Sequence, residues 1–154
     1  HRGADSGLDA EHQVPDGMDI GLVSINLEEG VVEYAGANSP GYLVRDGEVT
    51  ELRPDKRAIA SFEPGTHRYE THRMELQNGD MIYCASDGYA DQFGGPKGRK
   101  FMRKRFREML AELSLMGVDE QEKLLHARIE SWRKEAQEEQ VDDILVCGVR
   151  IRLG

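Results

Sequence analysis

The stretch GDMIYCASDGYADQFGG, residues 79–95, decides the fold of this chain. Its apolar run Met81–Cys84 follows a turn-forming Asn-Gly-Asp sequence, which is typical of a buried strand entered from a turn. Directly after this run come two carboxylates, Asp87 and Asp91, beside glycines that let the backbone bend sharply. A hard divalent cation prefers oxygen ligands held in fixed places. The end of this strand is therefore a candidate metal site.

A second acidic strand end lies near the C-terminus. Residues 140–143, QVDD, place Asp142 and Asp143 directly before an apolar run, Ile144–Ile151, that predicts a final strand. We expect the two acidic strand ends, at Asp87 and at Asp142, to meet in space around a metal ion.

The length and charge of the chain limit its class. Its 154 residues fit one domain with a buried core. The 20 basic and 29 acidic residues give a formal charge of −9, which argues against a duplex nucleic-acid binder, because such binding relies on neutralising phosphates. No apolar run approaches the ~20 residues needed to cross a bilayer, and residues 1–13 lack the apolar core of a signal peptide. We expect no nucleic-acid partner and no membrane contact by this segment.

Short strands and tight turns precede the candidate site. Residues 1–15 predict an irregular lead-in, and residues 53–67 predict a loop with two prolines. The dipeptide Asp46-Gly47 between two apolar runs is a strong hairpin signal, because glycine tolerates the positive φ that such turns require. The expected strands are a buried strand over 18–25 paired with 31–35, a hairpin of 42–45 with 49–52, and an edge strand over 68–76.

Helical periodicity begins after Asp91. Apolar residues recur at helical spacing from Met102 to Leu113, with basic residues on the opposite face. We expect Gly117 to end this helix in the left-handed conformation, and Asp119 with Glu122 to form a capping box for a second amphipathic helix. Strands followed by two amphipathic helices and a closing strand indicate an α+β fold, with helices on one face of mostly antiparallel sheet.

Several side chains have simple structural explanations. Cys84 and Cys147 are expected to be reduced, buried thiols of a cytosolic protein, although a disulfide between neighbouring strands stays open for an oxidising compartment. Asp16 and Asp19 are better explained by capping or surface hydrogen bonds than by metal binding. We expect the histidines 67, 72 and 126 to be exposed. The basic residues Lys100, Arg103, Lys104, Arg105 and Arg107 predict the solvated side of a helix or a contact with an acidic partner.

Four motifs in order carry a family resemblance. They are residues 16–20 (DGMDI), 34–38 (YAGAN), 79–80 with 86–95 (GD and SDGYADQFGG), and 140–144 (QVDDI). With these motifs the chain resembles the SpoIIE-type bacterial branch of the metal-dependent protein serine/threonine phosphatases, the protein phosphatase 2C-like (PPM) family. The resemblance covers residues 16–152, so residues 16–154 are expected to be the C-terminal part of such a catalytic domain.

The resemblance implies a fold, an activity and a set of site residues. The implied fold is an αββα sandwich of antiparallel sheets, with two or more Mn²⁺ or Mg²⁺ ions between the sheet edges. The implied reaction hydrolyses phosphoserine or phosphothreonine with metal-activated water, without a phosphoenzyme. Asp87 and Asp142 are implied to be metal ligands, and Asp91 to serve a third, weaker metal. Gly88, Asp143 and Asn38 are implied to support the ligands, although Asn38 is more simply a turn residue.

The resemblance also implies a partner and exposes a departure. By resemblance, the substrate is a small STAS-domain anti-sigma-factor antagonist in a partner-switching pathway, and the enzyme is cytoplasmic or the cytoplasmic part of a membrane-anchored protein with an upstream sensor domain. The family's first metal motif, an acid before a Gly-His-Gly-like turn, has no match in residues 1–15. We therefore expect the N-terminal part of the fold to be missing from this chain.

This departure leaves two further hypotheses beside the phosphatase. One is a catalytically incomplete binding or regulatory module of the same fold, which holds a phosphorylated partner without turning it over. The other is a structural α+β domain in which the acidic residues are surface turns.

Overall fold

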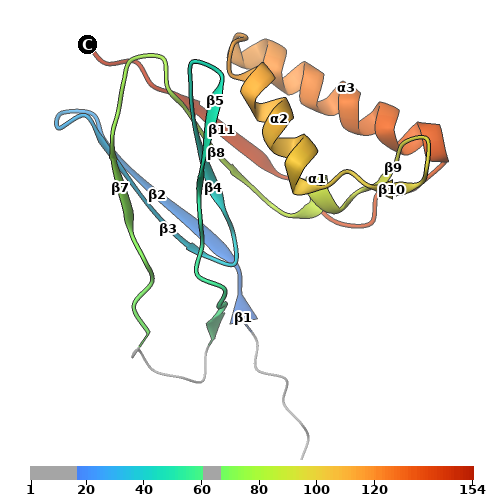
Figure 1. The fold of residues 1–154 in the computed structure, drawn as a ribbon, viewed down its shortest axis with the longest axis horizontal. Coiled ribbons are helices and arrows are strands. Elements are labelled where there is room, and N and C mark those ends of the chain that lie inside the picture. The colour runs from blue at the N-terminus through green and yellow to red at the C-terminus, as the bar shows by residue number, and fades with distance from the viewer. Residues whose placement is uncertain (1–16, 61–66) are drawn as a thin grey trace, which may run out of the picture.

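Two antiparallel sheets pack face to face, and the helices cover the outer face of one of them (Figure 1). This computed structural model describes residues 17–60 and 67–154. The four-stranded sheet has the order β11-β8-β4-β5 and the three-stranded sheet the order β2-β3-β7. The elements are β1 Gly17–Met18, β2 Ile20–Asn26, β3 Val31–Ala37, β4 Gly41–Arg45, β5 Glu48–Leu52, β6 Ile59–Ala60, β7 His72–Glu75, β8 Met81–Ala85, α1 Gly88–Asp91, β9 Phe93–Gly94, β10 Arg99–Lys100, α2 Arg103–Leu113, α3 Val118–Ala136 and β11 Val146–Arg150.

Strand β8 lies at the centre of both cores. Side chains alternate between the faces of a strand, so Met81 and Tyr83 face the helices whereas Ile82 faces the second sheet. The core under the helices includes Tyr42, Met81, Tyr83, Tyr89, Phe106, Met109, Leu110, Leu113 and Ile129. The core between the sheets consists of Val32, Leu43, Leu76, Ile82 and Ile151. The prediction of a buried strand at Met81–Cys84 is confirmed.

The predicted hairpins are also confirmed. Strand β2 pairs with β3 and β4 pairs with β5, both antiparallel. At the second turn Asp46 and Gly47 have φ values of 51° and 77°, which is the left-handed backbone that the Asp-Gly pair was expected to adopt. Strand β7 pairs only with β3, so it is the edge strand predicted over residues 68–76, although it is shorter. The short strand β1 pairs with β6, which lies in the region predicted as a loop. The predicted lead-in over residues 1–15 and the side chain of Asp16 lie outside the described residues.

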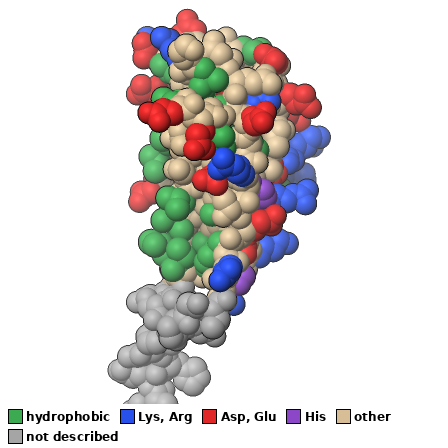
Figure 2. All heavy atoms as spheres, turned by 90° about the vertical axis from the view of Figure 1, so that its left-hand side faces the viewer, with side chains coloured by type: hydrophobic (Ala, Val, Ile, Leu, Met, Phe, Trp, Pro, Cys, Tyr) green, Lys and Arg blue, Asp and Glu red, His purple; other side chains and the backbone are tan. Residues whose placement is uncertain are grey.

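The expected αββα layering is present only in part. Within the described residues, helices cover the four-stranded sheet, and none packs on the outer face of β2-β3-β7. In contrast to the buried strand predicted over 18–25, Ile20 and Leu22 of β2 are therefore 37% and 64% exposed, and Met18 of β1 is 52% exposed. Figure 2 shows hydrophobic side chains gathered near the lower edge of this side of the molecule. None of the helices in the described ranges is long and apolar enough to span a membrane.

The predicted helix ends at Gly117 and Asp119 are wrong. Helix α2 already ends at Leu113, and Gly117 has φ −62° and is the N-cap of α3 rather than a left-handed C-terminal residue. Because α3 begins at Val118, Asp119 lies in its first turn and makes no capping box. The early start brings the buried Gln121 to Tyr83, whose hydroxyl donates to its Oε1 at 2.7 Å. A tertiary contact thus overrides the local capping signal.

The two cysteines face each other across neighbouring strands. Cys84 of β8 pairs in register with Cys147 of β11, and both thiols are free. Cys84 is half-buried but Cys147 is exposed, so the expectation that both thiols are buried is wrong for Cys147. Cys147 is exposed because β11 lies at the edge of its sheet.

We predict that a mild thiol oxidant such as diamide joins Cys84 to Cys147 within one chain. Opposite residues of antiparallel strands have Cα atoms about 4.5–5.5 Å apart, inside the range of disulfides. Burial raises the pKa of the Cys84 thiol, and the nearby Cys147 adds to this, so the reaction should accelerate above neutral pH. Non-reducing mass spectrometry should show a monomer lighter by two hydrogens, absent in Cys84→Ser. Crosslinking only between chains would contradict the β8–β11 register.

An ion pair between the buried Asp80 and the partly exposed Arg45 lies at the other end of β8. The Asp80 carboxylate is 1% exposed and accepts from Arg45 Nε at 2.9 Å and Nη2 at 2.8 Å, and from the Gln77 backbone at 2.8 Å. The Asp80 carbonyl accepts from the Ile151 backbone, which secures the end of β11. Burial alone would raise the pKa of Asp80, but the hydrogen bonds from Arg45 and Gln77 outweigh it and hold the pKa below its usual value.

We predict that Asp80→Asn lowers the free energy of unfolding by about 2–4 kcal/mol, because it leaves Arg45 without its buried anion. A lowered folded-state pKa gives stability that is present above the unfolded pKa, about 3.9, and lost as the pH falls through the folded pKa. Urea denaturation should therefore show that the variant depends less on pH below about 4 than the wild type. Asp46→Asn, an exposed carboxylate in the β4–β5 turn, is the control and should change stability little.

Candidate active site at the end of β8

The two acidic strand ends lie side by side. Ser86, directly after β8, donates its backbone N–H to the Leu145 carbonyl at 2.9 Å. Its hydroxyl donates to the Asp143 carbonyl and accepts from the Leu145 backbone, each at 3.0 Å. These bonds extend the β8–β11 pairing beyond Ala85 and Val146. The expectation that the strand ends meet is confirmed for the backbone of these segments.

Gly88 allows the two segments to touch. A Cβ atom at this position would lie 2.3 Å from the Asp143 carbonyl oxygen and 3.2 Å from Ile144 Cγ1, and real side chains do not approach backbone so closely. Gly88 also begins α1, a short helix that the sequence analysis did not predict, with Asp87 as its N-cap. The Asp87 side chain makes no capping hydrogen bond and is exposed.

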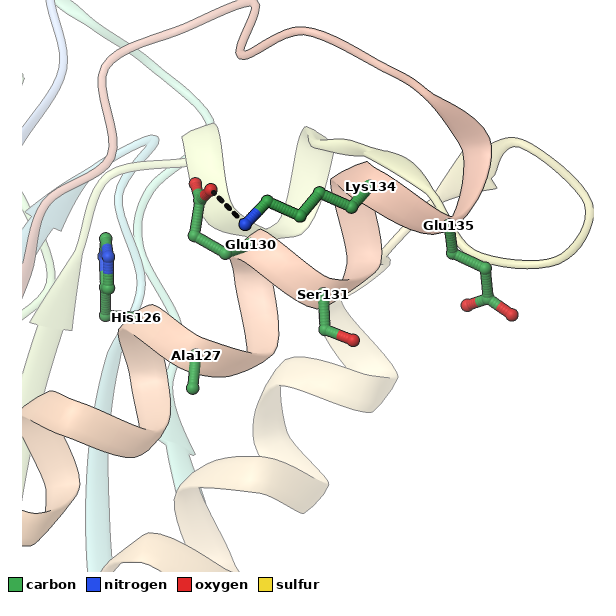
Figure 3. A pocket seen from close by; sticks show the side chains of 6 residues that line it. All are labelled: His126, Ala127, Glu130, Ser131, Lys134 and Glu135. Atoms are coloured by element: carbon green, nitrogen blue, oxygen red, sulfur yellow. Dashed lines mark ion pairs between the residues drawn. The ribbon is translucent and has the colours of Figure 1, made fainter.

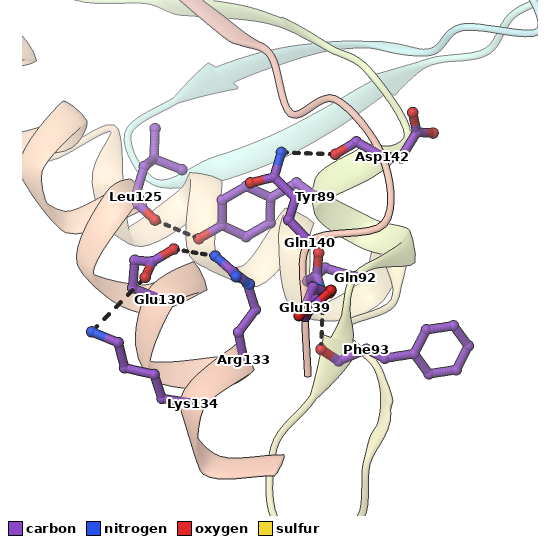
Figure 4. Close-up of polar contacts among 10 residues, drawn as sticks. All are labelled: Tyr89, Gln92, Phe93, Leu125, Glu130, Arg133, Lys134, Glu139, Gln140 and Asp142. Carbon is purple, nitrogen blue, oxygen red and sulfur yellow. Dashed lines mark hydrogen bonds and ion pairs between the residues drawn. The ribbon is translucent and has the colours of Figure 1, made fainter. Parts of the chain in front are cut away.

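Gln92 forms a further connection between the two motifs (Figure 4). This side chain is 2% exposed, and its Nε2 donates to the carbonyls of Phe93 at 3.0 Å and Glu139 at 2.9 Å. The Gln92 carbonyl in turn accepts from Trp132 Nε1 of α3 at 3.1 Å. The turn after β8 is thereby joined to the start of the QVDD segment. No local pattern around Gln92 indicates this role, because the hydrogen bonds of a buried glutamine depend on partners far along the chain.

The predicted ligands are not equally placed. Asp142 and Asp143 are exposed; Asp142 Oδ1 accepts from the Asp143 backbone at 2.8 Å, and its carbonyl accepts from Gln140 (Figure 4). Asp91 is exposed and forms an ion pair with Lys100 at 3.1 Å. Of the three predicted metal ligands, Asp87, Asp91 and Asp142, only Asp87 lines the cleft beside the end of β8. The metal roles of Asp87, Asp142 and Asp91 stay predictions.

This cleft has a volume of about 880 Å³ and lies between the ends of β3, β5 and β8 and the start of α2. Asp19 and Asn38 line it together with Asp87. Asn38 Nδ2 donates to Asp19 Oδ1 at 2.8 Å, so the Asp19 carboxylate has the surface hydrogen bond that we expected. Asn38 is nevertheless part of the cleft wall, in addition to being a turn residue.

The turn that carries Asn38 is fixed by an aromatic side chain. Asn38 has φ 55°, and its backbone N–H donates to the Asp55 carbonyl at 2.8 Å. The buried Tyr34 donates its hydroxyl to the Ser39 carbonyl directly after Asn38. Burial is the main reason that the pKa of Tyr34 rises to about 12, so the phenol stays protonated as a donor. The YAGAN motif thereby positions Asn38 at the cleft.

Basic side chains also line the cleft. They are Arg53 and Lys56, from the segment after β5, and Arg103, the first residue of α2. Arg107 is paired with Glu51 of the cleft wall at 2.7 Å. The sequence pattern predicts Arg103 on a basic helix face but indicates no role for Arg53 or Lys56, because only the folded chain brings the end of β5 and the start of α2 to one cleft.

A partial metal site fits this arrangement. Across residues 17–60 and 67–154, no group of three or more His, Cys, Asp or Glu side chains is arranged to hold a metal ion. Mg²⁺ and Mn²⁺ accept carboxylate oxygens, and Mg²⁺ is commonly held by only one or two carboxylates, with water and substrate phosphate as the other ligands. Asp87 and one oxygen of Asp142 are available for such a role.

A second hollow shows no cluster of side chains that suggests a catalytic or binding site. It lies on α3 and is lined by His126, Ala127, Glu130, Ser131, Lys134 and Glu135 (Figure 3). Lys134 is paired with Glu130, and His126 is exposed as predicted. His67 is exposed and contacts Asp55, whereas His72 is half-buried beside the Arg53 carbonyl, so the expectation of exposure is wrong for His72. Its imidazole Nε2 lies 2.8 Å from the Arg53 carbonyl oxygen and so joins β7 to the segment after β5.

Packed antiparallel sheets, helices on an outer face and acid-bearing strand ends beside one cleft define a protein phosphatase 2C-like fold. The SiaA-PP2C domain of Pseudomonas aeruginosa matches with a TM-score of 0.78 and 32% identity over 88% of this chain and 52% of that chain. The phosphatase domain of SpoIIE from Bacillus subtilis matches with a TM-score of 0.62 and 21% identity, over 88% and 56%. The Mycobacterium tuberculosis serine/threonine phosphatase PstP/Ppp matches with a TM-score of 0.62 and 18% identity, over 88% and 60%.

The chain belongs to the SpoIIE family, because the family model for Stage II sporulation protein E (SpoIIE) matches residues 4–152. It spans little more than half the length of the solved chains that it resembles. A comparison with curated proteins returned no significant match.

We predict that Gly88→Ala lowers the free energy of unfolding by about 1–3 kcal/mol, because the new methyl group forces the Asp143 carbonyl away. The matched control is Gly117→Ala, where the added Cβ meets nothing closer than a Glu120 oxygen at 4.0 Å, so only the smaller cost of alanine at the N-cap of α3 is expected. Urea denaturation gives the stabilities, and hydrogen exchange at Leu145 reports whether its bond to Ser86 loosens. Equal losses of stability in the two variants would contradict the close approach at Gly88.

Proposed function

We propose that this protein is a metal-dependent protein serine/threonine phosphatase of the 2C type. The observation that carries the proposal is the contact between two family motifs. The Ser86–Gly88 turn meets the Asp143–Leu145 backbone through hydrogen bonds and a glycine-only approach. The carboxylates of Asp87 and Asp142 are carried by the segments joined in this way.

The side chains around the cleft suit a phosphate monoester. Asp87 and Asp142 would hold Mn²⁺ or Mg²⁺, and Asp91 would serve a further ion after release from Lys100. A bound divalent ion lowers the pKa of a water ligand and offsets charge on phosphoryl oxygens. The chain itself contributes the exposed Asp87 carboxylate, the fixed amide of Asn38 and a polar cleft that admits a substrate side chain. Manganese supports the assignment by analogy: a PstP catalytic domain was solved in complex with 2 manganese ions.

The family resemblance supports a specific role for this activity. We propose that the substrate is a phosphorylated STAS-domain anti-sigma-factor antagonist in a partner-switching signalling pathway, and that the input comes from an upstream sensor domain. By the same resemblance, we place the activity in the cytoplasm or in the cytoplasmic part of a membrane-anchored protein.

One observation favours a second candidate, a binding module without turnover. In the described part of the chain, no group of three or more His, Cys, Asp or Glu side chains is placed to hold a metal ion. A chain that contributes only part of the ligand set would bind metal weakly and hold the phosphorylated partner without hydrolysing it.

We predict that Asp87→Asn and Asp142→Asn each reduce Mn²⁺-dependent phosphate release from a phosphoserine peptide about 100-fold or more, because each removes a charged ligand. Asp46→Asn is the matched control. Asp46 is also an exposed aspartate before a glycine, but it lies in the β4–β5 turn at the opposite end of the sheet. It should keep full activity.

Two measurements separate the candidates. Full activity in both site variants would overturn the phosphatase proposal. Calorimetry of this chain with Mn²⁺ addresses the second candidate: tight, stoichiometric binding of two ions would argue against an incomplete module. Peptide binding without any metal-dependent turnover would favour it.

A further inference from the structure

Three basic side chains of the cleft stand without acidic partners. Arg53, Lys56 and Arg103 line the cleft beside Asp87, and all three are exposed. None of them forms an ion pair within residues 17–60 and 67–154. Arg107, one turn beyond Arg103 on α2, is bound to Glu51 at 2.7 Å instead, so that the Glu51 carboxylate is already neutralised. The three remaining cations are available to an anionic ligand.

The segment that carries Arg53 and Lys56 is fixed before any ligand binds. Between them, Asp55 donates its backbone N–H to the Gly36 carbonyl at 2.9 Å and accepts from the Asn38 N–H at 2.8 Å. The Asp55 carboxylate accepts from the Glu70 backbone at 3.0 Å and lies 2.7 Å from His67 Nε2. These hydrogen bonds, the one from Glu70 first, lower the pKa of Asp55. Asp55 is thus engaged elsewhere and does not neutralise the two cations beside it.

Arg103 reaches the cleft from the start of α2, next to a packed pair of aromatic side chains. Tyr42 and Phe106 line the cleft and pack edge to face, with ring centroids 5.8 Å apart. Burial raises the pKa of Tyr42, and the nearby Arg103 is among the charges that oppose this rise. The basic side chains therefore come from both the segment after β5 and the start of α2, on a scaffold that is already formed.

These cations exceed what one phosphate group requires. A phosphoserine carries a charge of about −1.5 to −2, which the metal ions of the proposed function would already balance. We propose that Arg53, Lys56 and Arg103 select substrates whose phosphoserine is flanked by acidic residues, by binding the flanking carboxylates. This inference rests on the proposed function. Because the whole chain has a charge of −9, it repels acidic partners elsewhere, so these local cations determine which anions dock at the cleft.

The test uses two fluorescein-labelled phosphoserine peptides, one flanked by glutamates and one by glutamines. Fluorescence anisotropy with the full chain, in metal-free buffer at low ionic strength, gives each Kd without hydrolysis. The glutamate peptide should bind about tenfold more tightly, since exposed ion pairs contribute up to about fivefold each, and added salt should remove the difference. Arg53→Gln, Lys56→Gln and Arg103→Gln should each reduce this preference about two- to threefold, and the triple variant should abolish it.

The controls are Lys123→Gln and Arg152→Gln, which remove exposed charges outside the cleft. Lys123 lies on α3, and Arg152 follows β11 at the end opposite Asp87. Both should keep the full preference, and circular dichroism should show that every variant is folded. Equal affinity of the wild type for both peptides would overturn the proposal. So would a triple variant that weakens both peptides equally, because the cations would then bind the phosphate itself.

Hydrolysis is measured separately, so the two proposals fail in different ways. If Mn²⁺-dependent release of phosphate from the glutamine peptide is absent, the proposed phosphatase activity fails, whereas the difference in Kd still decides the selectivity of the cleft. If turnover is present and the difference in Kd is absent, the selectivity alone is overturned.

Discussion

The site depends on one close approach, that of the Gly88 backbone to the Asp143 carbonyl. A side chain at residue 88 would not fit, so the two acid-bearing segments meet only because this position is glycine. Ser86 and Gln92 hold the same contact from either side, through the carbonyls of Asp143 and Glu139. The carboxylates themselves stay exposed, which suits ligands that are completed by ions and substrate rather than by other side chains.

The rest of the fold keeps β8 and β11 from sliding past each other. At one end of the ladder, Arg45 pairs with the buried Asp80 carboxylate, and the Asp80 carbonyl accepts from the Ile151 backbone. Along the strand, alternate side chains enter two separate cores, so a shift of one residue would move Met81 and Tyr83 into the wrong core. The far end of the strand, where Asp87 lies, can then stay open and polar. The ion pair and the two cores that stabilise β8 thus lie away from the candidate site at Asp87.

Sequence patterns predicted correctly those features that depend on residues close together in the chain. The apolar run Met81–Cys84, the Asp46-Gly47 turn and the periodicity before Leu113 each describe contacts between near neighbours or one face of an element, and the structure has all three. The start of α3 was mispredicted because Gln121 accepts a hydrogen bond from Tyr83, which is distant in sequence. Likewise, the motifs indicated Asp87 and Asp142, but the cleft wall made by Asn38, Arg53 and Arg103 exists only after β3, β5 and α2 converge. Which distant segments pack together cannot be predicted from the residues of any one segment.

The cleft combines two kinds of charge that would cancel if they were in contact. Asp19 is bound to the neutral amide of Asn38, and Glu51 to Arg107, while Asp87 and the three cations form no ion pairs with each other. A surface evolved only for solubility gains nothing from keeping exposed opposite charges apart, since they attract weakly in water. Separation is useful when each set has its own ligand. Carboxylates and cations then remain available together, as the proposed metal-dependent dephosphorylation of an acidic phosphoprotein would require.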